Sequence, residues 1–217
     1  MPTITRLEVQ QKNKERVNLY LDDEFAFGLA LNLALGLKVG QSLTSQDINQ
    51  LQAQDTFEVA YARALNFLSY RARSEREIRS YLKKRTANHN SVPTDVVDSV
   101  LQKLRERGYV NDTQFAEDWV SYRQINRPSG RRMLAWEMRQ KGLPQPTIEA
   151  ALDDHDDAEA ALEAARKQAP RLAKLDYFTF RQRLGQFLGR RGFDYETIAD
   201  VVQSVWQNLH PDQPIPD

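Results

Sequence analysis

Two segments of this chain are similar to one another, without a gap, at a spacing of 50 residues. Residues 141–148 read Lys-Gly-Leu-Pro-Gln-Pro-Thr-Ile, and residues 191–198 read Arg-Gly-Phe-Asp-Tyr-Glu-Thr-Ile. The tripeptide Ser-Tyr-Arg likewise occurs at 69–71 and at 121–123, a spacing of 52. Periods of this length are typical of supersecondary units stacked along one axis, because each unit buries its apolar face against its neighbours. The chain is therefore predicted to be an array of repeats.

The stretch 104–123 indicates what kind of unit is repeated. Gly108 is the expected left-handed residue that ends one helix, and the arginines before it suit the negative end of a helix dipole. Asn111 or Asp112 can cap the helix that follows. The apolar residues of that second helix recur at i, i+4 and i+7 and are expected on one face: Phe115, Trp119 and Tyr122. The unit is thus helix, short turn, helix.

The N-terminal residues have a different period. Segments 3–9 and 16–21 place apolar residues among polar and charged ones with a period of about two, which predicts strands. A third short strand is expected at 25–27, so that a small antiparallel sheet covers residues 3–28. Residues 29–35 are predicted to form a short helix that ends at Gly36. Thr44 or Ser45 then caps the next helix, with Asp47 near its start.

From about residue 46 the pattern is helical throughout. Residues 74–77 (Ser-Glu-Arg-Glu) match a capping box, and 86–93 read as a polar loop. The fold class predicted is mainly α: an elongated array of three tandem three-helix repeats with a small N-terminal antiparallel β cap. Later helices are expected at 112–126, 129–141, 147–152, 158–168, 177–191 and around 198–206. The predicted boundaries are 1–45 for the β-rich extension, 46–111, 112–155 and 156–209 for the three repeats, and 210–217 for a tail.

Composition excludes several classes of protein. The chain has no cysteine, which rules out disulfides, thiolate zinc sites and a cysteine nucleophile. No apolar run approaches the roughly 20 residues that span a bilayer, and the N-terminus lacks the pattern of a secretory signal. A soluble cytoplasmic protein is expected, with no membrane partner. A monomer is the simplest state for a capped array.

Three motifs, taken in order, resemble a known family. They are 71–78 (Arg-Ala-Arg-Ser-Glu-Arg-Glu-Ile), 108–116 (Gly-Tyr-Val-Asn-Asp-Thr-Gln-Phe-Ala), and Lys-Gly-Leu at 141–143 followed by Ile148. Their order and spacing resemble the RecX family of bacterial recombination regulators. The resemblance is strongest over 56–152 and weaker over 157–207, and residues 1–45 look like the N-terminal extension that some members carry.

The resemblance implies a fold and a function. Members of that family are not enzymes; they bind the RecA recombinase and its filament on DNA, and usually inhibit its ATPase and strand exchange. Their fold is an elongated, curved array of three-helix repeats. The resemblance therefore implies a non-enzymatic regulator of recombination and DNA repair whose partners are RecA and, through the filament or directly, single- or double-stranded DNA.

Basic residues are concentrated in three windows, although the chain has 30 Lys and Arg and 30 Asp and Glu residues. Residues 71–107 hold ten basic and five acidic residues, 121–142 hold six and one, and 166–192 hold eight and one. Each basic window falls largely on the second helix of a predicted repeat, so repeats stacked in register would align the clusters as a stripe facing a nucleoprotein filament. The predicted partner- or nucleic-acid-binding residues are Arg71, Arg73, Arg76, Arg79, Lys83, Arg123, Arg127, Arg131, Arg132, Arg139, Arg181, Arg190 and Arg191.

Aromatic and acidic residues give further hypotheses. Most aromatic side chains lie at helical spacing and are expected in the core. Trp136 is the exception, because it lies off the apolar stripe of its helix and could stack on a base. The tract 153–157 (Asp-Asp-His-Asp-Asp) could offer ligands to a divalent metal, but helix capping and a flexible linker explain it better. The three histidines lie far apart, and no phosphate-binding glycine loop is visible. No catalytic residue, cofactor or metal site is predicted.

Two functions remain open from the sequence. The first is the filament regulator that the resemblance implies. The second is a sequence-tolerant DNA-binding protein of helical repeats with no recombinase partner, held by phosphate contacts alone. The second predicts binding to bare DNA with a steep salt dependence, whereas the first predicts a preference for the recombinase filament at equal ionic strength. A purely structural scaffold would leave the charge segregation without a use.

Overall fold

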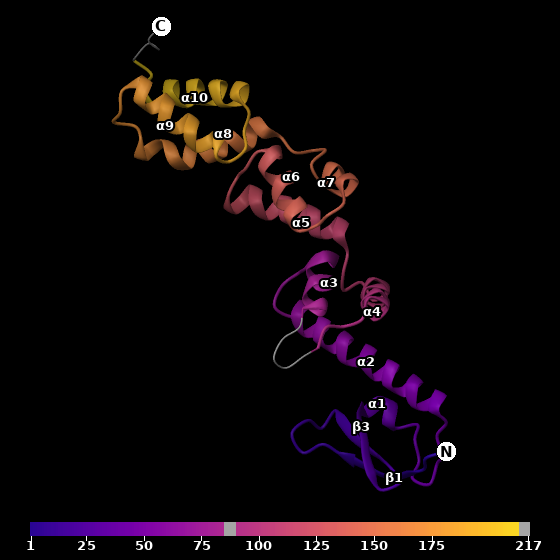
Figure 1. Cartoon of the computed structure of the whole chain (residues 1–217). Helices are drawn as coiled ribbons and strands as arrows, with labels where there is room; N and C mark the ends of the chain where they lie inside the picture. Colours follow the sequence, from indigo (N-terminus) through magenta and orange to yellow (C-terminus); the bar gives the residue numbers. More distant parts are fainter. Residues whose placement is uncertain (85–89, 213–217) are drawn as a thin grey trace. The chain divides into compact units, whose positions relative to one another are not determined.

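The computed structural model describes residues 1–84 and 90–212 (Figure 1). The described residues form two compact units: Met1–Arg73 with Glu77–Val110, and Ser74–Arg76 with the residues from Asn111 onward. Part of the predicted polar loop, 86–89, and most of the predicted tail, 213–217, lie outside the described residues. The prediction of a mainly helical chain with three three-helix repeats and a small N-terminal sheet is confirmed.

The N-terminal strands form one antiparallel sheet in the order β1-β2-β3. The strands are β1 (Ile4–Val9), β2 (Arg16–Leu21) and β3 (Glu24–Ala30), as predicted except that β3 is longer. Because β3 continues to Ala30, helix α1 is shorter than the predicted helix at 29–35 and comprises only Leu31–Ala34. One face of the sheet is buried, with the side chains of Ile4, Leu19, Leu29 and Leu43 at its centre.

The first repeat consists of α2 (Ser45–Leu68), α3 (Glu75–Lys83) and α4 (Thr94–Glu106). Thr44, one of the two predicted caps, is the N-cap of α2, and it forms a capping box with Asp47. Gly108 adopts a φ of 70° after α4, and the next amide, that of Tyr109, donates to the Leu104 carbonyl at 2.9 Å. The apolar core of this repeat includes Ala60, Ala64, Ile78, Leu82, Val97, Val100, Leu101 and Leu104.

The second repeat consists of α5 (Asp112–Asn126), α6 (Arg131–Gln140) and α7 (Gln145–Ala151). Asn111 caps α5 by accepting from the amides of Thr113 and Gln114. The apolar stripe predicted for α5 was wrong at one position, because Tyr122 is 57% exposed. The buried residues of α5 are Phe115, Ala116 and Val120. In the core of this repeat they pack with Leu134, Ala135, Met138, Leu143, Ile148 and Leu152.

The third repeat consists of α8 (Asp157–Gln168), a 3-10 turn (Ala169–Arg171), α9 (Tyr177–Gly189) and α10 (Tyr195–Leu209). Four small residues of α8 are buried, which lets α10 pack closely on it. The large buried side chains include Phe180, Leu184, Leu188 and Trp206. The third repeat therefore has an apolar core of its own.

The 50-residue similarity marks equivalent positions. Gly142 and Gly192 have φ values of 81° and 88° at the turn between the second and third helix of their repeats. The residue after each glycine is buried, and its amide donates back to the helix it leaves, Leu143 to Met138 and Phe193 to Leu188. The Ser-Tyr-Arg similarity does not mark equivalent positions, because 69–71 follow the end of α2 whereas 121–123 lie inside α5.

Among the helices of the described residues, none combines the length and the apolar character that crossing a membrane requires.

Candidate functional site

The thirteen predicted basic residues lie on both units. Four belong to the first unit: Arg71, Arg73, Arg79 and Lys83. The other nine belong to the second unit: Arg76, Arg123, Arg127, Arg131, Arg132, Arg139, Arg181, Arg190 and Arg191. Their surroundings differ, and these differences separate the residues that stabilise the fold from those that face solvent.

The arginines of the first unit make contacts with their own unit. Arg71 forms an ion pair with Glu77 at 2.7 Å, and Arg79 forms one with Asp98 at 2.6 Å. The Arg73 guanidinium lies 4.0 Å from the centre of the Phe67 ring, and its pKa is lowered, first by burial and then by the nearby charge of Arg71. Lys83, in the last turn of α3, is exposed.

Arg123 is part of a packed polar cluster in the second repeat. Glu137 accepts from Arg123 Nε at 2.8 Å, from Arg123 Nη2 at 2.7 Å and from Trp119 Nε1 at 3.0 Å. The side chains of Arg123 and Glu137 are only 17% and 13% exposed. The Trp119 ring also lies near two cations, the Arg123 guanidinium at 5.0 Å and Lys141 Nζ at 5.3 Å. Arg123 therefore holds α5 against α6. Because its guanidinium is paired with Glu137, it is less available to a partner than the sequence analysis predicted.

Arg191 connects the third repeat to the second. It donates from Nη1 to the Pro128 carbonyl at 2.8 Å, and its guanidinium lies 4.5 Å from the centre of the Phe187 ring. The pKa of Arg191 is lowered, first by burial and then by the charges of Arg127 and Arg123, so these three arginines are close enough to interact. The side chains of Arg127, Arg181 and Arg190 are exposed.

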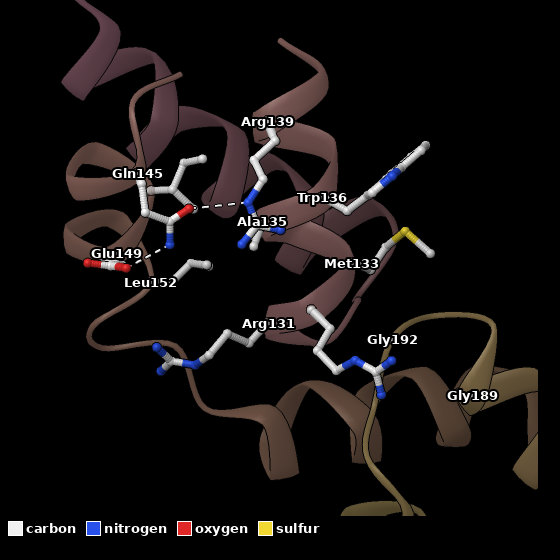
Figure 2. Close-up of a pocket in the computed structure, with 12 residues that line it drawn as sticks. Arg131, Met133, Ala135, Trp136, Arg139, Gln145, Glu149, Leu152, Gly189 and Gly192 are labelled. Atoms are coloured by element: carbon white, nitrogen blue, oxygen red, sulfur yellow. Dashed lines mark hydrogen bonds between the residues drawn. The ribbon is translucent and has the colours of Figure 1, made fainter. Parts of the chain in front are cut away.

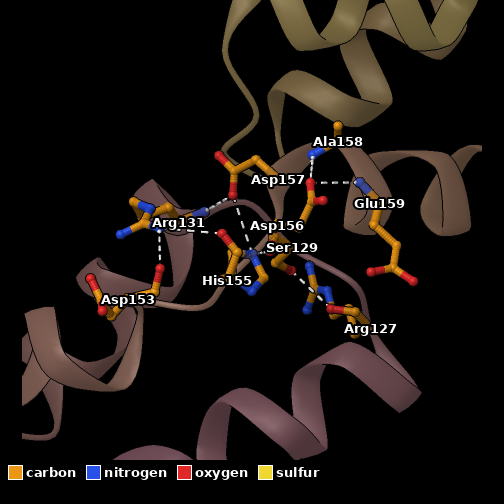
Figure 3. A network of polar contacts seen from close by, with 9 residues as sticks. All are labelled: Arg127, Ser129, Arg131, Asp153, His155, Asp156, Asp157, Ala158 and Glu159. Carbon is orange, nitrogen blue, oxygen red and sulfur yellow. Dashed lines mark hydrogen bonds and ion pairs between the residues drawn. The ribbon is translucent and has the colours of Figure 1, made fainter.

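Arg131 lies in a network at the start of α6 (Figure 3). Its backbone amide donates to Asp157 Oδ1 at 2.8 Å, and its Nη2 donates to the His155 carbonyl at 3.2 Å. The His155 ring is buried, with Nε2 3.1 Å from the Ser129 carbonyl oxygen and 3.2 Å from Asp157 Oδ1. Because both of these atoms are acceptors, Nε2 carries the proton. Arg131 is therefore an anchor between the second and third repeats.

The acidic tract 153–157 is structural. Asp156 caps α8 by accepting from the amides of Ala158 and Glu159, as the capping interpretation predicted. Burial raises the pKa of Asp157, but the hydrogen bonds from His155 and from the Arg131 amide outweigh that effect and hold it below the usual range. The flexible-linker interpretation was wrong for this segment, because His155 is buried in the joint. No group of three His, Asp or Glu side chains in the described ranges is placed to hold a metal ion.

The sequence did not predict that two adjacent residues cap different helices at the starts of the second and third repeats. Asn111 caps α5, while Asp112 accepts from the amide of Glu75 at the start of α3 at 2.9 Å. Asp156 and Asp157 divide the same two roles between α8 and α6. The sequence does carry a sign of this arrangement. Each of the two repeat starts has two adjacent residues of types that cap helices, although one helix start needs only one cap.

A groove lies on the second unit beside α6 (Figure 2). It has a volume of about 680 Å³ and is lined by α6, by α7, and by two glycines from the end of α9 and the turn after it. Three predicted basic residues line it, Arg131, Arg132 and Arg139, together with Trp136. The indole of Trp136 is 55% exposed, which confirms that it lies outside the core. This groove is where the structure places predicted cations next to an exposed aromatic ring.

Comparison with known proteins gives matches along most of the chain. Four family models match in order: the regulatory protein RecX N-terminal domain over residues 2–44, and the first, second and third three-helix domains of RecX over 60–104, 111–152 and 155–202. Regulatory protein RecX of Bacillus pumilus is 34% identical over 212 residues, which is 95% of this chain and 78% of the relative. Regulatory protein RecX of Listeria monocytogenes is 34% identical over 202 residues, 92% of this chain and 70% of the relative.

Solved structures agree. A crystal structure of a regulatory protein RecX matches with a TM-score of 0.71 and 27% identity, covering 94% of this chain and all of that one. A crystal structure of RecX from Lactobacillus salivarius matches with a TM-score of 0.60 at 24% identity, over 70% of this chain and 97% of that one, and supports the fold.

Proposed function

Because this chain belongs to the RecX family of regulatory proteins, we propose that it is a non-enzymatic regulator of homologous recombination. It binds the RecA filament on DNA and inhibits the ATPase and strand exchange of that filament. It acts as a monomer in the cytoplasm, where the filament forms. The observation that carries the proposal is the match of all four domains, in order, to a family of regulators.

The charged surface of the molecule supports this proposal and narrows the set of residues. Arginines with buried or paired guanidinium groups, such as Arg123 and Arg191, are committed to the fold. Exposed cations are the better candidates for contacts with the filament, because they lose little internal bonding when they meet a phosphate or a carboxylate. Among the predicted residues of the second unit, these include Arg76, Arg127, Arg132, Arg139, Arg181 and Arg190.

RecA ATPase activity on single-stranded DNA tests the proposal. When this protein is titrated in, we expect ATP hydrolysis to fall at ratios well below one molecule of this protein per RecA protomer. The reason is that one regulator bound to a filament affects many protomers. The double substitution Arg181→Glu and Arg190→Glu is expected to raise the half-inhibitory concentration by about tenfold or more, since each reversal replaces attraction by repulsion. Lys14→Glu, a reversal at an exposed cation of the β1–β2 loop, is the matched control.

The outcome also decides between the two functions considered from the sequence. Steady hydrolysis at excess protein, in salt where the protein still binds bare DNA, would contradict the filament proposal. The remaining function would then be sequence-tolerant DNA binding through phosphate contacts, with affinity that falls steeply as salt rises.

A further inference from the structure

We propose that the groove beside α6 is a binding site for single-stranded nucleic acid, in which one base stacks on Trp136 and the flanking phosphates meet Arg132 and Arg139. The groove lies within the second unit and is lined by residues from Arg131 to Gly192. The inference deepens the proposed function, on which it rests for its biological use. Its test uses bare DNA and therefore does not depend on the recombinase.

The arrangement follows from helical spacing. Arg132, Trp136 and Arg139 occupy positions i, i+4 and i+7 of α6, so their side chains start from one face of the helix. Figure 2 shows that the Arg139 side chain then turns toward Gln145 of α7, whereas the Trp136 ring extends away from α7. A rise of about 1.5 Å per residue separates the two arginines by about 10 Å along the axis, with the indole between them. A cation, an aromatic ring and a second cation thus follow one another along the exposed side of a single rigid element. Successive phosphates with a base between them present the complementary order.

Trp136 differs from the other two tryptophans in its exposure. Trp119 donates to Glu137, and Trp206 is buried in the core of the third repeat. Trp136 is more than half exposed, and Figure 2 shows its ring projecting from α6 on the same side as Met133. An exposed indole is a large apolar surface that gains from being covered, and every nucleobase offers a face that can cover it.

The floor of the groove is apolar and has room for a base. Ala135 of α6, Ile148 of α7 and Leu152 just after α7 line it, together with two glycines that have no side chain to obstruct it, Gly189 and Gly192. A volume of about 680 Å³ exceeds the space that one stacked base needs. A flat, uncharged base fits such a floor, while its phosphates stay at the rim.

The charges at the rim favour an anion. Among the described residues no partner of the Arg132 guanidinium is found, and Arg139 uses Nε alone, in a bond of 3.2 Å to Gln145 Oε1. Arg131 is held by the His155 carbonyl and contributes its charge to the field. Glu149 is the acidic residue of the lining, and it accepts from Gln145 Nε2 at 2.6 Å on α7. Three cations against one carboxylate leave the groove positive.

A nucleic acid strand fits better than an acidic peptide. An extended peptide is recognised largely through its main chain, which pairs with an open sheet edge. The walls of this groove are the helices α6 and α7, whose backbone groups are bonded within each helix. A base requires only an aromatic face and nearby cations, and both are present here.

Tryptophan fluorescence with a short oligothymidylate tests the site, because Trp136 is the exposed indole among three. We expect quenching on binding, and loss of that quenching in Trp136→Phe, in which the labelled oligonucleotide should still bind within about threefold by anisotropy. Trp136→Ala should weaken binding by about 10-fold to 100-fold, as removal of a stacking ring does. Because the ring lies outside the core, this variant should keep the wild-type melting temperature. Tyr195→Ala, at an exposed aromatic residue of α10 that does not line the groove, is the matched control.

The arginines give a second readout. Arg132→Ala and Arg139→Ala should each reduce the slope of log affinity against log salt by about 0.7, the value for one phosphate on a single strand. Equal oligonucleotide affinities for Trp136→Ala and the wild-type protein would overturn the inference. So would binding of a labelled acidic peptide that depends on Trp136 when oligonucleotide binding does not, because the groove would then be a protein-docking site.

The inference and the proposed function fail separately. If RecA hydrolysis is inhibited while oligonucleotide binding does not depend on Trp136, only the inference fails. If oligonucleotide binding depends on Trp136 while RecA hydrolysis is unaffected, the proposed function fails and the site remains.

Discussion

At the scale of single residues, two equivalent glycines combine an unusual backbone conformation with a close contact. Gly142 and Gly192 take left-handed φ values, which a glycine adopts without steric cost. Each also lies against a second helix. A Cβ at Gly192 would come within 2.6 Å of the Met133 backbone nitrogen, and one at Gly142 would meet the Arg76 side chain. Both the conformation and the contact therefore require glycine.

Gly192→Ala should destabilise the protein by about 3 kcal/mol, since it combines left-handed strain of about 1–2 kcal/mol with an overpacked contact of about 1–3 kcal/mol. Gly108→Ala is the matched control. It has a φ of 70° but no atom within 4 Å of the added Cβ, so only the strain is expected. Urea denaturation of both variants measures the difference. If Gly192→Ala and Gly108→Ala lost the same stability, Met133 would have moved away from the added Cβ without an energetic cost.

Single residues also decide which cations are available. Arg123 and Arg132 look alike in a charge count, yet Arg123 is paired with Glu137 and packed near Trp119, whereas Arg132 is exposed. The net charge of residues 121–142 shows that α6 and the residues beside it are basic. It could not predict which arginines are paired, because the partners lie on another helix.

At the scale of elements, the second helix of a repeat begins with a carboxylate that belongs to the start of the following repeat. Asp112 serves α3 and Asp157 serves α6. In the third repeat, α9 is instead capped by its own Asp176, which accepts from the Thr179 amide at 3.1 Å. A carboxylate at a helix N-terminus stabilises the helix through a hydrogen bond and through the dipole. A carboxylate of one repeat therefore stabilises a helix start of the repeat before it, whereas α9 of the third repeat is capped by a residue of its own repeat.

Asp157→Asn should lower the free energy of unfolding at pH 7 by about 1–2 kcal/mol, because a charge-assisted bond to the Arg131 amide and the contact with His155 are weakened. The pKa of Asp157 is lowered in the folded state, so its stabilising contribution is present above the unfolded pKa of about 3.9 and is lost as the pH falls through the lower, folded value. The difference between variant and wild type should therefore shrink below about pH 4. Denaturation at pH 7 and at pH 3 measures it, and a difference that does not change with pH would contradict the argument.

At the scale of the whole molecule, the described residues contain four separate apolar clusters, one for the sheet and one for each repeat. Proteins built this way gain stability from each repeat and from its contacts with immediate neighbours, so a defect in one core need not spread along the chain. The predicted boundaries between repeats, at 111/112 and 155/156, stay predictions that such local stability can test.

Leu184→Ala should raise hydrogen exchange in α9 and α10 while leaving α2 and α4 unchanged. Leu184 is fully buried in the third-repeat core, and its truncation costs about 3 kcal/mol of local stability. Exchange measured by mass spectrometry on peptic peptides resolves these segments. Faster exchange in all repeats together would mean that the chain unfolds as one cooperative unit.

Patterns between residues that are near one another in the sequence were enough to predict the helical-repeat fold and the family. The 50-residue period, Gly108, the Asn111 cap and the alternation in the first strands are local signals, because turns, caps and faces depend on neighbours in the chain. The order of three short motifs was also enough for the family. Trp136 could be singled out in the same way, since its distance from the apolar stripe is visible in one helix.

The pairing of charges needed the packed structure. Arg191 finds the Pro128 carbonyl 63 residues away, Arg131 finds His155 24 residues away, and Asp157 caps a helix that begins 26 residues before it. Such contacts depend on how helices pack, which no local pattern encodes. Because of these contacts, Arg131 and Arg191, which were predicted to bind a partner, connect the second and third repeats. Arg132, Trp136 and Arg139 remain exposed on α6.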